Sequence, residues 1–311
     1  MPDHEYHTPV MVQEVTHGLQ IRPDGIYVDC TFGGGGHSKK ILESLGQAGR
    51  LIAFDQDPSA ARNLPADPRV TFVPHNFRHL KRFLRLHEIS RVHGILADLG
   101  VSSHQFDEAS RGFSTRFDAK MDMRMNPHQE LDASRVVNQY SEAELHKIFE
   151  QYGEVTNSKT LAKRIIEVRK TQKISTVSQF KESLYPVVKG NPDKYFAQVF
   201  QALRIEVNDE LGALKEMLWQ VPEVLEGGGR IAVITFHSLE DRMVKNFFRS
   251  GSFEEEEVVE DLYGRKTPPV FRVITKKPLT ASGEELKSNP RSRSAKLRIA
   301  ERLPVNSKSS F

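Results

Sequence analysis

The stretch that decides the fold is Ile26-Tyr-Val-Asp-Cys-Thr-Phe-Gly-Gly-Gly-Gly-His37, an apolar run followed by four consecutive glycines. The apolar run predicts a short buried strand over 26–30, and the segment 38–45 after the glycines predicts a helix. Glycines at such a turn let the backbone approach a ligand closely, and the helix N-terminus favours a negative group. A tight turn without a ligand is the simpler alternative, and only further residues can separate the two.

Strand and helix patterns alternate on both sides of this loop. Pro58 suits the first turn of a helix, and apolar spacing over 79–87 predicts another helix. The predicted further strands are 50–55, 70–73, 94–98, 230–236, 270–275 and 295–300, the last two following an acidic run at 254–257. Strands alternating with helices at this spacing indicate an α/β fold with a doubly wound sheet.

The middle of the chain has a different pattern, polar and helical in spacing and without strand candidates. Two capping-box pairs, Ser141 with Glu144 and Thr176 with Gln179, predict the starts of two helices. A long helical run is expected from 191 towards 225, broken or bent near Pro222. We therefore expect one α/β domain interrupted by a helical insertion: 1–105 as its first part, 106–190 as the insertion and 191–311 as its second part.

Composition restricts the class of protein only broadly. The chain has 311 residues, a net charge of +3 and one cysteine, Cys30. A single cysteine excludes an intramolecular disulfide and fits a reducing compartment. The sequence has no apolar stretch of bilayer-spanning length and no signal-peptide pattern at its start. We therefore expect a soluble cytoplasmic protein, and the mild positive charge permits a polyanionic partner without requiring one.

Asp55 makes the glycine loop a predicted nucleoside site. It ends the second predicted strand, where a carboxylate can accept hydrogen bonds from ribose hydroxyls. A dinucleotide fingerprint is incomplete, because its third glycine would fall on Ser38 or Lys39, and Asp29 would repel a pyrophosphate. S-adenosylmethionine carries a sulfonium and an ammonium, which a nearby carboxylate favours, and its own carboxylate suits the helix N-terminus. Charge therefore favours the methyl donor over a nicotinamide cofactor.

Two further loops follow predicted strands. Phe77, after the third strand, is positioned to lie against an adenine ring, although a phenylalanine at the edge of the core is the alternative. Phe236-His-Ser-Leu-Glu-Asp-Arg242 could present His237 or Glu240 at the same edge, or could hold a structural histidine at a helix start. No cysteine and histidine cluster has metal-ligand spacing, so no metal site is expected.

The motifs taken together closely resemble the RsmH (MraW) family, the ribosomal RNA small-subunit methyltransferase H enzymes. The matching blocks run in order through nearly the whole chain: His7-Thr-Pro-Val10, Asp24-Gly-Ile-Tyr-Val-Asp29, Thr31-Phe-Gly-Gly-Gly-Gly-His37-Ser38, Asp98-Leu-Gly-Val-Ser-Ser103, Arg111-Gly-Phe-Ser114, Asp122-Met-Arg-Met125, Gln201-Ala-Leu-Arg-Ile205, Phe236-His-Ser-Leu-Glu-Asp-Arg242 and Asn289-Pro-Arg-Ser-Arg293.

The resemblance implies a Rossmann-like S-adenosylmethionine-dependent methyltransferase fold with a helical insertion, and an N4-methylcytidine product in the decoding region of 16S ribosomal RNA. Two positions depart from the family pattern: His104 stands where proline is usual, and Asn126 where aspartate is frequent. Both concern loop geometry. The cofactor contacts that the resemblance implies are Gly35, Gly36, His37, Asp55, Phe77, Asp98 and Gln105.

The resemblance does not identify the residue that activates the cytosine amine. That amine is a poor nucleophile, and an acceptor on its N–H would localise the lone pair. Asp98, Ser102 or backbone carbonyls could accept this bond, while a turn or a helix cap is the alternative role for the aspartate and the serines. The catalytic residue therefore stays open.

Basic segments favour RNA as the partner, and the resemblance implies 16S rRNA within the small ribosomal subunit. Each segment alone is typical of a solvated surface. A small-molecule methyltransferase and an RNA-binding assembly factor without turnover stay open as alternatives, and so does the oligomeric state, a homodimer included. The segments are Arg111, Arg116, Lys120 and Arg124, interleaved with Phe113 and Phe117; Lys159, Lys163 and Lys170 on one predicted helix face; and Arg291, Arg293, Lys296 and Arg298.

Overall fold

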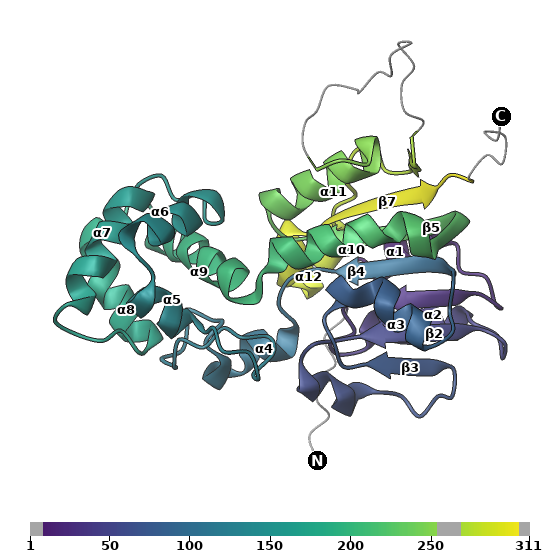
Figure 1. The fold of residues 1–311 in the computed structure, drawn as a ribbon, viewed down its shortest axis with the longest axis horizontal. Coiled ribbons are helices and arrows are strands. Elements are labelled where there is room, and N and C mark those ends of the chain that lie inside the picture. Colours follow the sequence, from purple (N-terminus) through teal and green to yellow (C-terminus); the bar gives the residue numbers. More distant parts are fainter. Residues whose placement is uncertain (1–8, 254–268, 305–311) are drawn as a thin grey trace, which may run out of the picture. The chain divides into compact units, whose positions relative to one another are not determined.

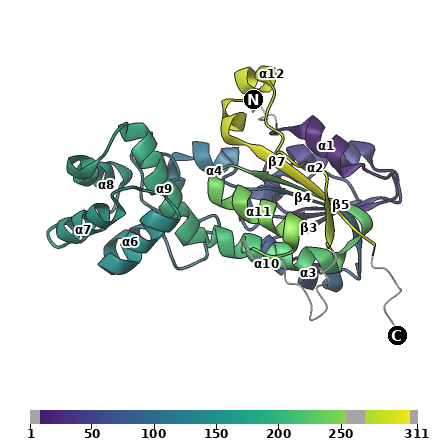
Figure 2. The same cartoon turned by 90° about the horizontal axis from the view of Figure 1, so that it is seen from above.

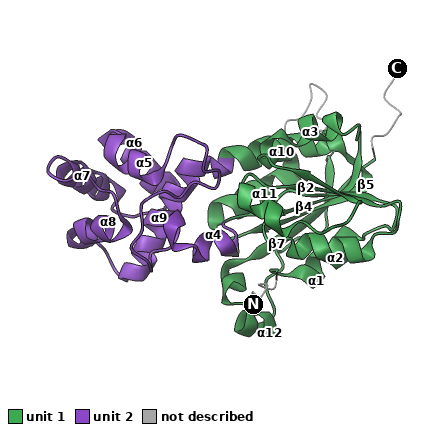
Figure 3. Ribbon diagram, turned by 90° about the horizontal axis from the view of Figure 1, so that it is seen from below, with its two compact units in different colours: residues 1–100, 212–311 green, residues 101–211 purple. Residues whose placement is uncertain are grey.

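The computed structural model describes residues 9–253 and 269–304. The chain divides into two compact units, Met1–Gly100 with Gly212–Phe311 as unit 1 and Val101–Leu211 as unit 2 (Figure 3). His7 of the first family motif and the acidic run 254–257 lie outside the described residues.

Unit 1 is built on a seven-stranded sheet of order β3-β2-β1-β4-β5-β7-β6 (Figure 1). The first five of these strands pair in parallel, and β7 pairs antiparallel with both β5 and β6. The strand order reverses between β1 and β4, which is the switch point where open α/β sheets bind ligands. The strands are β1 Ile26–Asp29, β2 Arg50–Phe54, β3 Val70–Val73, β4 Val92–Asp98, β5 Leu225–Thr235, β6 Phe271–Val273 and β7 Lys296–Arg302.

Every strand expected from the sequence is present. The glycine-rich start of β5 differs from expectation, because the strand begins at Leu225 rather than at Arg230. Its register with β4 shifts between the pairs Val92–Leu225 and Gly94–Arg230, and Gly228 in this bulge has a positive φ of 81°. Regular pairing therefore starts at Arg230, where the apolar run starts.

Helices cover both faces of this sheet (Figure 2). Successive residues of β1 point to opposite faces: Tyr27 packs in one apolar cluster with α1 and α2, and Val28 in another with α3, α10 and α11. Burial on both faces explains why the strands read as continuous apolar runs. The helical elements are α1 Val12–Leu19, α2 Gly36–Ser44, α3 Leu80–Leu86, α10 Glu210–Val224, α11 Ser238–Ser250, α12 Gly283–Ser288 and the 3₁₀ turns Pro58–Asn63, Phe77–His79 and Pro290–Ser294.

Unit 2 is helical and has its own apolar core. Both predicted capping boxes are present, with Ser141 opening α6 and Thr176 opening α8. Its elements are α4 Ser103–Asp107, α5 Ala133–Gln139, α6 Glu142–Gln151, α7 Ser158–Arg169, α8 Val177–Leu184, α9 Pro192–Asn208 and the 3₁₀ turns Ala109–Arg111 and Tyr185–Val187.

The single long helix expected from 191 towards 225 is two helices. Asp209, in a left-handed conformation with φ 47°, separates α9 from α10, and aspartate tolerates this conformation better than most residues. Pro222 lies inside α10 and does not end it.

The compact units also divide the chain differently from the expected boundaries of the insertion, 106–190. The buried face of α9, including Phe196 and Leu203, packs in the core of unit 2. Asn208 adds polar contacts there, accepting the Met125 N–H at 2.7 Å and donating to the Met123 carbonyl at 2.8 Å. The helical unit is therefore longer at both ends than the sequence pattern indicated. Among the described residues, no helix combines the length and apolar character needed to span a bilayer.

Candidate cofactor site

The glycine loop is held in place by the strands on either side of it. The Gly33 N–H donates to Asp55 Oδ2 at 2.7 Å, and the Asn63 side-chain amide donates to the Gly33 carbonyl at 2.9 Å. Gly35 caps α2 with φ 76°, and a Cβ there would lie 3.0 Å from the Phe32 ring. A Cβ on Gly34 would meet nothing within 4 Å. The loop thus has a fixed base and a backbone that a ligand can approach.

Asp29 is a buried carboxylate with a structural role. Only 1% of it is exposed, and burial raises its pKa, with the charge of Asp98 adding to the shift and His37, Ser38 and Thr31 opposing it. One oxygen accepts the Thr31 N–H at 3.0 Å and the other accepts the Ser38 hydroxyl at 2.7 Å, which ties the end of β1 to α2. The Thr31 hydroxyl in turn accepts the Asp98 N–H at 2.7 Å. Thr31 thereby joins the loop to β4, a role that no local sequence signal indicates; the same holds for Asn63.

Asp55 lies at the end of β2, as the sequence predicts, and is half-buried. Its two oxygens accept the N–H groups of Gly33 and Asp57, at 2.7 and 2.8 Å. Burial raises the pKa of Asp55 to about 6, with the charges of Asp57 and Asp29 adding to it and the two backbone N–H groups opposing it. Because each carboxylate oxygen can accept more than one hydrogen bond, Asp55 retains acceptor capacity for hydroxyl groups.

His37 and Asp98 lie close together, and several of their side-chain atoms have no hydrogen-bond partner among the described residues. His37 Nε2 lies 3.4 Å from Asp98 Oδ2. Within the described residues, neither nitrogen of His37 nor Asp98 Oδ1 has a hydrogen-bond partner, although all three atoms are buried. Buried polar atoms are nearly always hydrogen-bonded in proteins. Three such atoms together at the carboxyl ends of parallel strands indicate a polar ligand.

Phe77 and Gln105 occupy defined local positions. Phe77 opens the 3₁₀ turn before α3, is half-buried and packs against the sheet's apolar cluster, so it lies at the edge of the core. Gln105 belongs to unit 2 and forms a capping box with Ser102 at the start of α4, each N–H being 3.2 Å from the other's side-chain oxygen. Ser102 is therefore a helix cap, as the alternative interpretation expected.

His237 also has the structural role that was its alternative. It caps α11, accepting the Glu240 N–H at 3.5 Å, and Glu240 accepts the Phe236 N–H at 2.9 Å. The His237 Nε2 to Glu240 Oε1 distance is 3.1 Å, and both side chains are buried. These contacts stabilise the turn from β5 into α11.

Part of the basic sequence is structural rather than free for a partner. Arg298 is 6% exposed and pairs with Asp241 at 2.6 Å, and Lys296 lies 3.4 Å from the same carboxylate. Arg298 is therefore not available to the basic segment predicted for RNA, because β7 places it in a buried ion pair, whereas the Lys296 side chain is 43% exposed. Arg124 likewise pairs with Asp122 at 2.7 Å, and Arg111 donates to the Arg124 carbonyl at 2.8 Å.

Other basic residues predicted for RNA contact in unit 2 are exposed. Lys159, Lys163 and Lys170 are all exposed along α7 and at its end. The Arg116 guanidinium lies 5.3 Å from the Phe106 ring centre and 5.9 Å from that of Phe117, which is 42% exposed.

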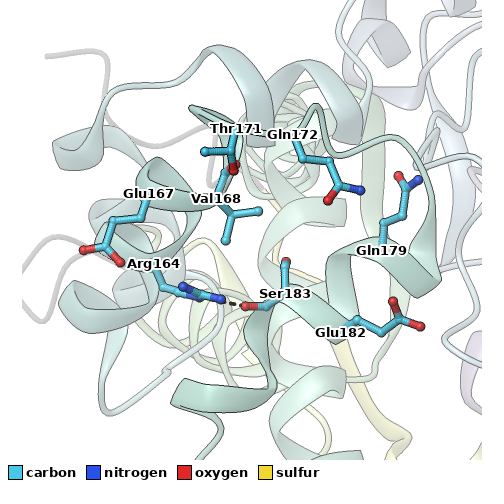
Figure 4. Close-up of a pocket in the computed structure, with 8 residues that line it drawn as sticks. All are labelled: Arg164, Glu167, Val168, Thr171, Gln172, Gln179, Glu182 and Ser183. Carbon is cyan, nitrogen blue, oxygen red and sulfur yellow. Dashed lines mark hydrogen bonds between the residues drawn. The ribbon is translucent and has the colours of Figure 1, made fainter.

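A cavity of about 340 Å³ opens between α7 and α8 in unit 2 (Figure 4). The Arg164 Nε donates to the Ser183 carbonyl across it at 2.9 Å. None of the residues implied as cofactor contacts lines it. The lining residues are Arg164, Glu167, Val168, Thr171, Gln172, Gln179, Glu182 and Ser183.

The residues at the carboxyl ends of β1, β2 and β4 fit a methyl donor such as S-adenosylmethionine. Asp55 has spare acceptor capacity for ribose hydroxyls, and Asp98 Oδ1, which no described residue hydrogen-bonds, suits a cationic or N–H group. The open side of the glycine loop precedes the N-terminus of α2, whose N–H groups suit a carboxylate. Asp29 adds a negative charge that disfavours a pyrophosphate.

Comparisons with known proteins agree with this chemistry. The model of the MraW methylase family matches residues 4–303. Ribosomal RNA small subunit methyltransferase H of Parabacteroides distasonis is 54% identical over 300 residues, covering 96% of this chain and 98% of that protein. The protein of the same name from Flavobacterium johnsoniae is 53% identical with the same coverage.

Among solved structures, an rRNA methylase from Streptococcus thermophilus is 12% identical with a TM-score of 0.38, covering 94% of this chain and 93% of that one. Aeropyrum pernix fibrillarin, solved with bound S-adenosyl-L-methionine, is 9% identical with a TM-score of 0.35, covering 92% and 74%. Because the family model and the relatives extend over almost the full length, this chain belongs to the MraW methylase family, and its cofactor is S-adenosylmethionine.

Proposed function

We propose that this chain methylates N4 of a cytidine in the decoding region of 16S ribosomal RNA, acting in the cytoplasm on the small ribosomal subunit. The observation that carries the proposal is the near full-length identity of more than 50% to proteins named ribosomal RNA small subunit methyltransferase H. The glycine loop and the three strand-end aspartates supply a site that suits the reaction.

The residues around the loop would hold the methyl donor. We assign the ribose hydroxyls to Asp55 and the adenine ring to Phe77. The backbone of Gly35, Gly36 and His37 leaves room for the amino-acid part, and Asp98 and Gln105 complete the contacts. When bound, the cofactor supplies an electrophilic methyl group on a sulfonium; its transfer breaks the S–CH₃ bond, leaves that electron pair on sulfur and forms an N4–CH₃ bond.

Asp98 is the residue we assign to the amine. The lone pair of the cytosine amine is delocalised into the ring, so an acceptor on its N–H is needed to localise it. Asp98 Oδ1 is a buried acceptor with no partner among the described residues. It can accept a hydrogen bond from the N4–H group before methyl transfer, and it can accept the proton that N4 loses afterwards. A positioned acid or base typically increases the rate of the chemical step by about 10²- to 10⁴-fold.

We assign recognition of the RNA to the helical insertion, expected at 106–190. Exposed lysines along α7 suit phosphate groups. The exposed ring of Phe117, with Arg116 beside it, suits base stacking. The target cytosine must be unpaired or flipped out, because an amine engaged in pairing cannot reach the methyl group.

The test is release of S-adenosylhomocysteine by the purified chain with and without small ribosomal subunits. The proposal expects turnover only with subunits. Turnover on small molecules alone would identify a small-molecule methyltransferase instead. Binding to subunits without turnover would identify an assembly factor, and either result would contradict the proposal.

A further inference from the structure

The His37 imidazole has an environment that backbone contacts to a cofactor do not explain. It lies in the first turn of α2, is 7% exposed and has no hydrogen bond from either nitrogen within the described residues. Its nearest charged partner is Asp98 Oδ2, 3.4 Å from Nε2. At this distance and without hydrogen-bond alignment, the attraction between the two groups depends on charge, and it is strong only while the ring is protonated.

The charged groups that act on His37 come from three elements and are all acidic. They are Asp98 of β4, Asp29 of β1 and Glu285 of α12, which also accepts the Met11 N–H at 2.8 Å. Burial lowers the pKa of His37, but these carboxylates, Asp98 first among them, outweigh burial and leave the pKa raised. The surroundings therefore favour an imidazolium beside Asp98.

We propose that His37 is a positioning residue for methyl transfer: its imidazolium holds Asp98 by Oδ2 and leaves Oδ1 available to the substrate amine. This inference rests on the proposed function of Asp98. Because the folded-state pKa of His37 is raised, the imidazolium is present at lower pH and is lost as pH rises through that pKa. Turnover should therefore decline on the alkaline side as the hold on Asp98 is released.

The variant His37→Gln removes the charge at similar size. Its kcat on small subunits should fall about ten- to hundredfold, the scale of a misplaced catalytic group, with a change of no more than about threefold in KM for S-adenosylmethionine. The alkaline decline should also disappear. Unchanged kcat with the decline intact would overturn the proposal, and so would a loss confined to cofactor KM.

The matched control is His93→Gln. His93 lies on β4 as Asp98 does, but at the amino end of that strand, where its Nε2 pairs with Glu226 at 3.2 Å. This variant should keep the wild-type rate and pH profile. If it lost the alkaline decline as His37→Gln does, the decline would not report on His37.

A second measurement needs neither cofactor nor RNA. NMR titration can follow the His37 imidazole, identified among the 12 histidines by the signal missing from His37→Gln. Asp98→Asn should lower the pKa of that signal. A pKa that Asp98→Asn does not change would overturn the pairing, even in an active enzyme. If the wild-type protein showed the coupled titration but methylated no rRNA, the proposed function would fail and the pairing would stand.

Discussion

At the scale of single residues, three carboxylates lie at the carboxyl ends of three neighbouring parallel strands, and each has different surroundings. Asp29 is buried and bonded to Ser38, so it holds the loop. Asp55 is half-buried with both oxygens already accepting one N–H, so it can accept from a ligand as well. Asp98 keeps one oxygen that has no hydrogen-bond partner in the part of the chain that the structure describes. In the proposed function, the same chemical group therefore supports structure, binds cofactor and accepts a proton within one site.

Asp55→Ala should weaken binding of S-adenosylmethionine by about 1.5–3 kcal/mol, the scale of a hydrogen bond to a charged group. The loss combines the ribose contact with the loosened Gly33 loop. Calorimetry measures the affinity, and a melting curve shows that the variant is folded. Unchanged affinity in a folded variant would remove Asp55 from the cofactor site.

Cofactor affinity should also depend on pH through Asp55. Its pKa is raised to about 6, so the carboxylate is ionised above that pH and protonated below it. The ionised form is the better acceptor, so affinity should fall as pH drops through about 6. Because the pKa of Asp55 is raised, this group contributes to the stability of the folded state at pH values below its pKa in the unfolded chain. That stability contribution is lost as pH rises through about 6. Asp55→Asn should flatten the acidic fall in affinity; a fall that persists in this variant would assign it to another group.

Asp98→Asn should lower kcat more than it raises KM for RNA, because it removes an interaction that matters most in the transition state. Asparagine has the same size as aspartate, and the hydrogen bond to the Thr31 hydroxyl comes from the backbone N–H of residue 98. The fold should therefore persist in this variant. Single-turnover kinetics on small subunits give the comparison. A variant with the wild-type single-turnover rate would exclude Asp98 from the chemistry.

At the scale of elements, the sequence predicts what local chemistry determines. The strands, the helix after the glycines and both capping boxes follow from apolar period and from side chains that bond their own backbone. The division between α9 and α10 could not be predicted, because it depends on a left-handed Asp209 rather than on the proline. The burial of Arg298 could not be predicted either, because its partner Asp241 is brought to it only by the antiparallel pairing of β5 and β7.

The proposed role of α7 in RNA binding can be tested by removing its exposed lysines. Replacing Lys159, Lys163 and Lys170 with alanine should weaken binding to small subunits and flatten its salt dependence, because fewer counterions are released. Cofactor affinity should stay the same. Filter binding across a salt series gives the slope.

The matched control neutralises Lys245, Lys276 and Lys277, three exposed lysines of unit 1. It removes the same charge and should reduce the slope less. If the α7 variant kept the wild-type slope and methylated subunits normally, α7 would be no part of the RNA site.

At the scale of the whole molecule, two units with separate cores divide the proposed work. Unit 1 carries the glycine loop and the strand-end carboxylates, and unit 2 carries the exposed lysines and Gln105. The positions of six of the seven implied cofactor residues on one sheet edge follow from strand order. The bonds that distinguish their roles, such as Thr31 to Asp98, required the structure. We expect folded or assembled rRNA as the substrate, because only RNA with a defined shape can contact basic segments on two units at the same time.

The central claim is tested most directly by the position of the transferred methyl group. Small subunits lacking the modification are incubated with the chain and S-adenosylmethionine carrying a deuterated methyl group, and the 16S rRNA is digested for mass spectrometry. The account predicts labelled N4-methylcytidine in a decoding-region fragment, greatly reduced with Asp98→Asn. Label on another base or another atom of cytidine, or no label in 16S rRNA, would contradict it.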